Sequence, residues 1–389
     1  MSNTQKKNVP ELRFPGFEGE WEEKKLGEVA KIYDGTHQTP KYTNEGIKFL
    51  SVENIKTLNS SKYISEEAFE KEFKIRPEFG DILMTRIGDI GTPNIVSSNE
   101  KFAYYVSLAL LKTKNLNSYF LKNLILSSSI QNELWRKTLH VAFPKKINKN
   151  EIGKIKINYP KKQEQQKIGQ FFSKLDRQIE LEEQKLELLQ QQKKGYMQKI
   201  FSQELRFKDE NGNDCPEWEE RRFADIFKFH NKLRKPIKEN LRVKGSYPYY
   251  GATGIIDYVD DFIFDGNYLL IGEDGANIIT RSAPLVYLVN GKFWVNNHAH
   301  ILSPLNGNIQ YLYQVAELVN YEKYNTGTAQ PKLNIQNLKI ISVVISTNLE
   351  EQQKIGSFLS KLDRQIDLEE QKLELLQQRK KALLKLMFV

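Results

Sequence analysis

The sequence predicts an α+β fold in which two mixed α/β modules are joined by two long helices. We expect these helices to form an antiparallel coiled coil and the chain to be approximately two-fold symmetric. Two observations lead to this prediction. A stretch of 31 residues occurs twice, at Glu164–Lys194 and Glu351–Lys381, with only four differences, and such repetition decides an architecture. Two stretches unlike each other, residues 30–137 and 229–325, contain short strand patterns and alternate with these copies.

Each copy of the repeat predicts a coiled-coil helix. Apolar residues recur at alternating spacings of four and three, beginning with Ile168, Phe172, Leu175 and Ile179, which is typical of the seam between paired helices. The residues between them are mainly Glu, Gln, Lys and Arg, all of which favour helix. At about 1.5 Å per residue, a helix over Glu164–Phe201 would be roughly 57 Å long.

Four charged residues interrupt the apolar seam: Glu182 and Lys193 in the first copy, and Glu369 and Lys380 in the second. A parallel pair would place like charges opposite each other. An antiparallel pair in which facing residue numbers add up to 562 brings Glu182 to Lys380 and Lys193 to Glu369. Because a buried charge that loses its partner costs about 3–5 kcal/mol, we predict that these four residues set the register. Two helices that never meet are the alternative.

The repeat extends beyond the helices. Residues 12–14 and 21–29 near the N-terminus recur as residues 205–207 and 218–226. The segment that follows the first helix therefore has its counterpart at the N-terminus. We expect residues 10–21 to pack near the end of the second long helix.

The two unlike stretches read as modules of short strands and helices. Helices are predicted at Asn117–Ser127 and Ile309–Val319. Strands are predicted at Ile32–Tyr33, Lys48–Val52, Gly80–Arg86, Tyr247–Tyr250, Tyr268–Ile271 and Leu285–Val289.

Composition narrows the class of protein. The 389 residues carry a formal net charge of +9 and a pI near 9.1, which favours an anionic partner, nucleic acid first and an acidic membrane second. Cys215 is the sole cysteine, so an intrachain disulfide and a cysteine-based zinc site are excluded. The sequence has no long apolar run and no signal-peptide pattern at its start. We expect a cytoplasmic protein that does not enter the membrane.

Motifs of catalysis are missing from the sequence. It contains no phosphate-binding G-x-x-x-x-G-K-[ST] loop, no G-x-G-x-x-G and no Asp/Asn-Pro-Pro-aromatic element. His298 and His300 could be metal ligands, but without a third ligand at a suitable spacing a role in supporting the fold is favoured. Glu273-Asp274-Gly275 could be an acid–base pair, and a turn is again the favoured interpretation.

The chain resembles the specificity (S) subunit of type I restriction–modification enzymes. The family signature stands here as Gln166-Lys167-Ile168 followed by Leu175-Asp176-Arg177-Gln178-Ile179, and again at 353–355 and 362–366. The resemblance covers nearly the whole chain. It implies a first target recognition domain at residues 1–159, a central conserved helical region at 160–202, a second target recognition domain at 203–346 and a distal conserved helical region at 347–389.

The resemblance also implies a function. The chain would be a non-catalytic DNA-binding subunit that reads a bipartite, asymmetric target, with one half-site for each recognition domain. Its helices would set the spacing and dock two methyltransferase (M) subunits, and up to two restriction (R) subunits would join. The holoenzyme would be an adenine-specific DNA methyltransferase and an ATP-dependent endonuclease. S-adenosylmethionine would belong to M, and ATP and Mg²⁺ to R, with no cofactor or metal in this chain. A coiled-coil interaction scaffold without DNA specificity is the alternative.

Residues that read bases must be polar side chains on exposed loops, with Arg, Lys, Asn and Gln favoured. An ordinary solvated surface residue is the alternative for each candidate. The candidates in the first module are Thr36, His37, Gln38, Lys41, Arg86, Lys145 and Lys146. Those in the second module are Asn277, Arg281, Asn296, Asn297, Gln330 and Lys332.

Overall fold

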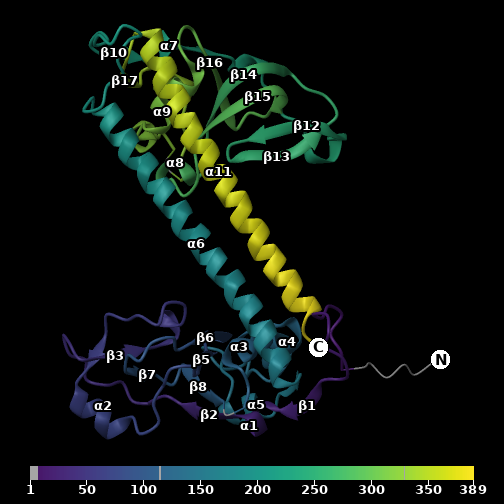
Figure 1. Cartoon of the computed structure of the whole chain (residues 1–389). Coiled ribbons are helices and arrows are strands. Elements are labelled where there is room, and N and C mark those ends of the chain that lie inside the picture. The colour runs from purple at the N-terminus through teal and green to yellow at the C-terminus, as the bar shows by residue number, and fades with distance from the viewer. Residues whose placement is uncertain (1–7, 114, 328) are drawn as a thin grey trace. The chain divides into compact units, whose positions relative to one another are not determined.

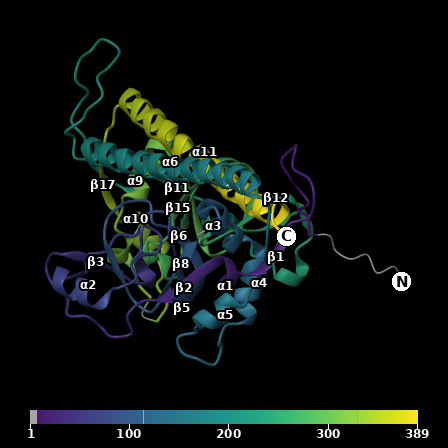
Figure 2. The same cartoon turned by 60° about the horizontal axis from the view of Figure 1, so that its bottom comes forward.

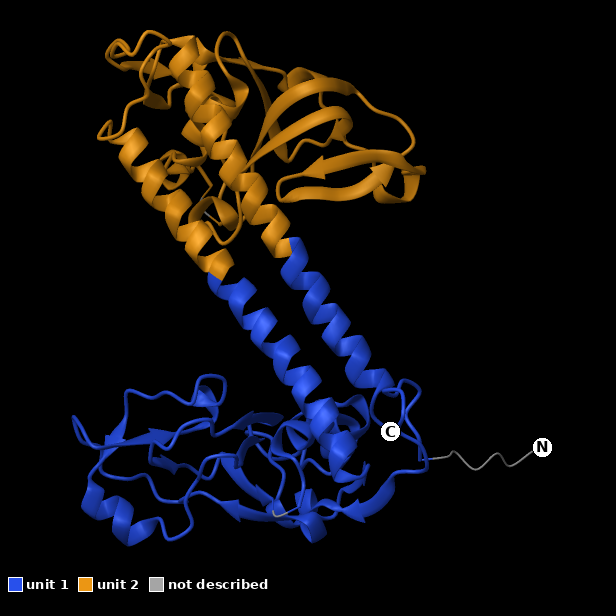
Figure 3. Ribbon diagram, viewed as in Figure 1, with its two compact units in different colours: residues 1–184, 371–389 blue, residues 185–370 orange. Residues whose placement is uncertain are grey.

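A computed structural model describes residues 8–113, 115–327 and 329–389 of the chain (Figure 1). The chain divides into two compact units: residues 1–184 with 371–389 form unit 1, and residues 185–370 form unit 2 (Figure 3). The long helix α6 spans Lys162–Phe201 and the long helix α11 spans Leu349–Leu386. Each unit therefore contains one of the two unlike modules and a part of both long helices.

Unit 1 contains three small sheets. Their strand orders are β2-β8-β5-β6, β4-β3-β7 and β1-β9. The strands are β1 (Glu22–Lys25), β2 (Ala30–Asp34), β3 (Ile47–Leu50), β4 (Tyr63–Ile64), β5 (Ile82–Ile87), β6 (Asp89–Ile95), β7 (Phe102–Tyr104), β8 (Leu108–Thr113) and β9 (Lys156–Tyr159). The helices outside α6 and α11 are α1 (Leu26–Val29), α2 (Glu66–Glu72), α3 (Ser118–Leu126), α4 (Ser128–Arg136) and α5 (Lys149–Gly153).

Unit 2 is built around a single larger sheet with the order β11-β16-β14-β15-β12-β13, and a two-stranded sheet β10-β17 accompanies it. The strands are β10 (Glu219–Arg222), β11 (Phe227–Phe229), β12 (Lys244–Gly251), β13 (Gly254–Val259), β14 (Phe264–Gly272), β15 (Val286–Val295), β16 (Ala299–Pro304) and β17 (Ser342–Ile345). The helices are α7 (Phe223–Ile226), α8 (Asn277–Thr280), α9 (Ile309–Glu317) and α10 (Ile335–Lys339).

Both modules begin and end in the same way although their sheets differ. The first strand of each module pairs antiparallel with the last, β1 with β9 and β10 with β17. A one-turn helix then follows the first strand, α1 in unit 1 and α7 in unit 2. A helix capped by an asparagine side chain precedes the end of each module: Asn117 caps α3 and Asn308 caps α9. These helices confirm the predictions made at 117–127 and 309–319.

The predicted strands are found, with longer or shifted bounds. The pattern at Leu285–Val289 continues as β15 to Val295, and the pattern at Lys48–Val52 ends at Leu50 because a 3-10 turn begins at Val52. In the described part of the chain, no helix combines the length and the apolar character that crossing a lipid bilayer requires.

The N-terminal segment packs against the end of α11, as the circular repeat predicts. The Leu12 backbone N–H donates to Leu386 O at 2.9 Å, and its counterpart in unit 2, the Leu205 N–H, donates to Lys199 O at 2.9 Å. Trp21 and Phe388 meet edge to face in the buried core of unit 1, with 6.3 Å between the ring centroids. Burial of these rings stabilises the joint between the chain's two ends within this unit.

The repeated helix start, Glu-Gln-Gln-Lys-Ile-Gly, makes corresponding contacts in each unit, and this set of contacts is here called the clamp. In unit 1 the buried Glu164 carboxylate accepts two hydrogen bonds of 2.7 Å from Arg13. Gln165 Oε1 accepts from the Asn117 backbone N–H at 3.0 Å. A Cβ on Gly169 would lie 2.6 Å from Asn117 Oδ1, so this position of α6 admits only glycine without a shift.

Unit 2 repeats the clamp with corresponding residues. Arg206 donates to Glu351 at 2.6 and 3.1 Å. The Asn308 backbone N–H donates to Gln352 Oε1 at 2.9 Å. A Cβ on Gly356 would lie 2.4 Å from Asn308 Oδ1. The clamp therefore explains why the sequence of the helix start is the same in both copies.

The segments of α6 and α11 run antiparallel within each unit. In unit 1, Lys380 pairs with Asp176 at 2.6 Å and Lys372 with Glu182 at 2.5 Å. As the residue number rises along one helix it falls along the other, which confirms the predicted direction.

Unit 2 has the same direction and the same register. Lys185 pairs with Glu369 and Lys193 with Asp363. The numbers of the ion-paired residues add up to 554 or 556 in both units, and those of two amide–carboxylate pairs, Gln377 with Glu183 and Gln190 with Glu370, add up to 560.

The ion pairs of the four seam charges differ from the predicted pairs. Lys380 reaches Asp176 and Lys193 reaches Asp363, while Glu182 pairs with Lys372 and Glu369 with Lys185. The sums of the ion-paired residue numbers lie 6 or 8 below the predicted total of 562. Each seam charge extends sideways to an opposite charge at the flank of the seam. Lys193 and Lys380 keep 21% and 22% of their side chains exposed, whereas the Glu182 and Glu369 side chains are only 13% and 6% exposed. The role of the four residues as register setters stays a prediction.

Candidate DNA-binding surfaces

The predicted base contact at Arg86 is wrong because this side chain lies inside unit 1. Only 5% of it is exposed. Its guanidinium forms an ion pair with Asp34 at the end of β2, and its Nε donates to Ile147 O at 3.0 Å. Arg86 therefore fastens two segments on which other candidates lie, the loop after β2 and the segment around Lys146.

The loop after β2 presents three of the other candidates to solvent. His37, Gln38 and Lys41 are exposed, and Thr36 is half-buried. The backbone of Thr36 holds the loop in place: its N–H donates to Tyr104 O at 3.1 Å, and its carbonyl accepts from Val106 N at 2.9 Å.

Lys145 and Lys146 are exposed as well, on the loop between α4 and α5. The Lys145 ammonium lies 4.7 Å from the centroid of the Trp135 ring. The Lys145 carbonyl accepts from the Gly88 N–H, just after β5, at 2.8 Å. In unit 1, the buried Arg86 therefore holds two loops that carry exposed cationic side chains, the loop after β2 and the loop between α4 and α5.

Two of the candidates in unit 2 are buried and structural, so their prediction as base contacts is wrong. Asn277 is buried and donates to Ala283 O and Pro284 O at 3.0 and 3.2 Å. Asn296 is buried and accepts from the His298 N–H at 2.8 Å. Both amides satisfy turn backbone that would otherwise be left without partners.

Arg281 pairs with Glu317 and keeps 30% of its side chain exposed, so its role as a base contact stays a prediction. Its Nη2 donates to both the backbone oxygen and the carboxylate of Glu317, at 2.9 and 2.5 Å. Its backbone has φ of +47°, the left-handed region that ends helix α8. Burial tends to raise the pKa of Glu317, and the Arg281 charge offsets part of this effect.

Asn297, Gln330 and Lys332 are exposed. Two of them are tied to one charged cluster around Glu273, which is mostly buried. Arg234 forms an ion pair with Glu273 at 2.5 Å and donates to Asn297 O at 3.1 Å, while Lys332 Nζ lies 3.4 Å from Glu273 Oε1. This cluster positions the loops of unit 2 as Arg86 does those of unit 1.

The histidines next to this cluster support the fold, as favoured from the sequence. His300 is buried between the side-chain amide of Asn231, at 2.7 Å, and the Leu333 carbonyl, at 2.9 Å. Burial lowers the pKa of His300, which keeps the ring neutral. Among the residues that the structure describes, no three His, Cys, Asp or Glu side chains gather as a set of metal ligands.

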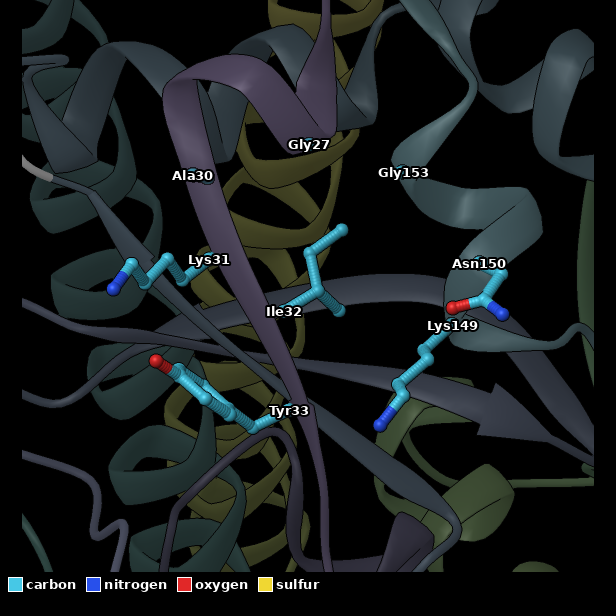
Figure 4. A pocket seen from close by; sticks show the side chains of 8 residues that line it. All are labelled: Gly27, Ala30, Lys31, Ile32, Tyr33, Lys149, Asn150 and Gly153. Carbon is cyan, nitrogen blue, oxygen red and sulfur yellow. The ribbon is translucent and has the colours of Figure 1, made fainter.

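A hollow of about 480 Å³ lies beside β2 in unit 1. Figure 4 shows Lys149 and Asn150, from the start of α5, on one side of it and the β2 residues Lys31–Tyr33 on the other. Lys149 Nζ lies 3.4 Å from Asp34. No carboxylate, histidine or cysteine is among the described residues that line the hollow, so it offers no acid–base pair.

The comparison with known families agrees with this arrangement of two modules on one scaffold. Residues 18–191 and residues 216–378 match the model of the type I restriction modification DNA specificity domain. The chain belongs to this family. Its two matched ranges each contain one module and the start of the long helix that follows, which confirms the resemblance seen in the sequence.

Individual relatives in the specificity-domain family match over shorter or longer stretches. A putative type I restriction enzyme specificity subunit of Haemophilus influenzae is 36% identical over 116 residues, and the EcoprrI specificity subunit of Escherichia coli is 31% identical over 118. These matches span 30% of the chain and only 30% and 28% of the two relatives.

Longer similarity exists at lower identity. The MjaIX specificity subunit of Methanocaldococcus jannaschii is 22% identical over 374 residues, which cover 84% of the chain and 83% of that protein. The crystal structure of the type I S subunit from Mycoplasma genitalium, 18% identical, has a TM-score of 0.73 and covers 98% of this chain and 99% of its own. The fold is therefore that of the specificity subunits.

Sequence reasoning missed residues that matter for this specificity-domain chain. Asp176 and Asp363, inside the repeated Leu-Asp-x-Gln-Ile motif, link the long helices to the modules. Lys122 of α3 pairs with Asp176 at 3.0 Å, and Gln314 of α9 donates to Asp363 at 2.7 Å. Figures 1 and 2 label the helices α3 and α9. Their invariance between the two copies was the signal that could have identified them.

Proposed function

We propose that the chain is the DNA-recognition subunit of a type I restriction–modification complex and that each module reads one half of a bipartite, asymmetric target. One observation carries the proposal: two unlike modules are held by the same clamp contacts on two nearly identical helices. A repeated frame with divergent modules is what two separate half-sites require. The exposed loops rooted on Arg86 and on Glu273 supply the polar and cationic side chains for base edges and phosphates.

Methylome sequencing of host DNA with and without the gene for this chain tests the proposal. We expect a split motif with two unlike halves and a spacer of unspecified bases. Replacing residues 229–325 with the module of another specificity subunit should change one half and leave the other unchanged. A single continuous palindrome in the wild-type methylome would contradict the two-module assignment.

The alternative, a coiled-coil scaffold without DNA specificity, predicts a different response to salt. A subunit that neutralises several phosphates loses affinity steeply as salt rises, by about 10³–10⁵ between about 50 and 200 mM for 6–10 contacts. Titration of a duplex pool with the assembled complex at these two concentrations distinguishes the two. An affinity that does not depend on salt would favour the scaffold.

The helices are proposed to dock the methyltransferase subunits through apolar side chains that they leave in solvent. Leu181 and Leu375 are exposed in unit 1, and Leu188 and Leu368 are exposed in unit 2. Leu181 follows Asp176 by five residues, which places it about 140° further around α6 at 3.6 residues per turn. It therefore points away from the module that Asp176 holds, toward the side that a partner can reach.

Leu181→Glu with Leu375→Glu should reduce the methyltransferase that co-elutes with the chain in size-exclusion chromatography. Glu183→Gln, an exposed change on the same helix turn, is the matched control. Full recovery of the complex with the double leucine variant would remove the helices' proposed role in docking.

The chemistry is proposed to reside in the partners. S-adenosylmethionine would be bound by the M subunits, and ATP with Mg²⁺ by the R subunits. The isolated chain is then expected to neither methylate nor cleave DNA when these compounds are added. Turnover by the purified chain would contradict this division.

A further inference from the structure

The loop Leu139–Lys146 of unit 1, here called the aromatic loop, is fixed at its base and free at its tip. The Leu139 N–H donates to Lys146 O at 2.8 Å and closes the loop. A bridge between Lys146 and Ile87 joins this base to the end of β5. A loop closed in this way presents its tip in a defined place.

The tip exposes two large apolar side chains. Val141 is 99% exposed and Phe143 is 104% exposed, which is as much as in an extended chain. Burying a phenylalanine side chain stabilises a fold or a complex by about 1.5–3 kcal/mol. In this fold the Phe143 ring contributes no such stabilisation, because it remains in solvent. Exposed apolar groups that cluster in this way mark an interaction site.

The surroundings of the tip are cationic and aromatic. The half-exposed Trp135 ring has the His140 ring 4.3 Å away and the Lys145 ammonium 4.7 Å away. Lys146 and Arg136 are also exposed. The acid nearest to Arg136 in sequence, Glu133, already pairs with it at 2.8 Å. A polyanion that also offers flat apolar surfaces matches this chemistry, and double-stranded DNA is such a partner.

The corresponding loop of unit 2 has a different character. It precedes α10 as the aromatic loop precedes α5. Its Lys332 forms a bridge with Asp274 just after β14, as Lys146 does with Ile87 at the end of β5. Its described residues between Asn325 and Lys332 include Gln330 and no aromatic side chain. The two modules therefore present unlike groups at equivalent places.

We infer, on the basis of the proposed DNA-recognition function, that Phe143 is a specificity-determining residue for the half-site read by unit 1. Its ring enters a groove of the duplex and makes apolar contact with the bases there, and Val141 supports it. Thymine methyl groups are the usual apolar feature of the major groove, and rings of this kind also wedge between base steps in the minor groove. Lys145 and Lys146 contact the phosphates on either side. Unit 2 reads its half-site through polar groups.

The test uses the chain in complex with its methyltransferase and a duplex pool with randomised bases. Bound duplexes are selected and sequenced for the wild type, for Phe143→Ala and for Phe79→Ala. Phe79 is an exposed phenylalanine of the same unit that precedes the N-terminal end of β5, whereas the aromatic loop contacts the C-terminal end of that strand. Its replacement is therefore a matched control. Because both rings lie in solvent, neither variant is expected to lose stability, and thermal unfolding checks this.

Phe143→Ala should lose base preference at one or two adjacent positions of one half-site. It should bind the duplex selected by the wild type at least tenfold more weakly, whereas Phe79→Ala should keep both preference and affinity. Lys145→Ala with Lys146→Ala should weaken selected and random duplexes by similar factors and reduce the salt dependence, as loss of phosphate contacts does. Duplexes with deoxyuridine in place of thymidine identify a methyl contact if they reproduce the loss in the wild type.

Two results would overturn the inference, and they can be told apart. If Phe143→Ala selects the same motif with affinity within twofold of the wild type, the aromatic loop does not read DNA, although the proposed function stands. The loop would then be a surface for another protein. If the wild-type complex enriches no motif at all, the proposed function fails and this inference fails with it.

Discussion

The clamp at the start of α11 allows a quantitative test of what holds unit 2 together. The Glu351 carboxylate is fully buried and accepts from Arg206 at 2.6 and 3.1 Å and from the Trp218 indole N–H at 3.0 Å. Glu351→Gln keeps the shape, removes the charge and leaves Arg206 facing a neutral amide. Removing one partner of a buried ion pair costs about 3–5 kcal/mol. We expect the lower end of this range, because 21% of the Arg206 side chain is exposed.

A loss of about 3 kcal/mol corresponds to a fall in Tm of roughly 6–12 °C for a unit of this size. The measurement is thermal unfolding followed by tryptophan fluorescence, since Trp218 lies at the clamp. Glu350→Gln is the matched control: Glu350 is the adjacent residue, and its ion pair with Lys354 is one-third exposed on both sides. Such a surface pair contributes less than about 1 kcal/mol. Equal Tm values for the two variants would refute the argument that the buried clamp stabilises the unit.

The same clamp predicts how stability depends on pH. Burial alone would raise the pKa of Glu351, but the interactions with Arg206, Ser346 and Trp218 outweigh it and lower the pKa below its ordinary value of 4.5. A carboxylate with a lowered pKa contributes stability above its unfolded pKa and loses it as the pH falls through its folded pKa. The Tm difference between wild type and Glu351→Gln should therefore be constant at neutral pH and shrink below pH 4.5. A difference that grows on acidification would contradict this.

Two further predictions concern the long helices. Gly356→Ala should destabilise unit 2 by about 1–3 kcal/mol, because the added Cβ would lie 2.4 Å from Asn308 Oδ1. At Gly195 an added Cβ would meet nothing within 4 Å, so Gly195→Ala should stabilise the helix by up to about 1 kcal/mol. Urea unfolding of both variants measures the difference. Lys380→Glu should lower the urea midpoint by an amount that reflects about 1 kcal/mol. Asp176→Asn in the same chain removes the repulsion and keeps an acceptor for Lys122, so it should recover part of the loss, whereas Glu182→Gln should not. Recovery by Glu182→Gln instead would favour the register predicted from the sequence.

The parts of the fold that could be predicted from the sequence are those that the repeat encodes. The 3–4 spacing of apolar residues predicts both long helices, and the position of residues 205–207 after the first helix predicts where Leu12 packs. These inferences depend on periodicity and on comparison of the chain with itself. They do not depend on the details of side-chain contacts.

The register could not be predicted in the same way because it depends on the direction in which long side chains extend. Lys380 and Lys193 were expected to face acids across the seam, yet each reaches an aspartate at its flank, Asp176 or Asp363. The sequence contains both the facing and the flanking acids. Residue spacing predicts which side chains lie on the seam, but it does not determine which of these acids a long lysine side chain reaches.

The candidate base contacts fall into two groups, those that the fold buries and those that it exposes. Arg86, Asn277 and Asn296 are polar residues next to turns, which is also the description of a residue that reads DNA. In the fold they satisfy backbone groups inside each unit. Polarity indicates that a side chain needs a partner, and only the packing shows whether that partner is within the chain. The aromatic loop illustrates the converse, since Phe143 would be assigned to a core by composition and lies in solvent.

The contacts common to both units explain how unlike modules fit one frame. Each module shares a buried apolar core with the long helix that follows it, and corresponding polar contacts add to this: the Asn117 or Asn308 backbone on a glutamine of the helix start, and Lys122 or Gln314 on an aspartate further along. The aspartate pairs with a cation in one unit and accepts from an amide in the other, so at that position a module must only offer a donor. A module that supplies these donors, and an apolar face for the shared core, can therefore differ elsewhere. Divergence can then be concentrated on the loops that we propose read DNA, because the frame does not depend on them.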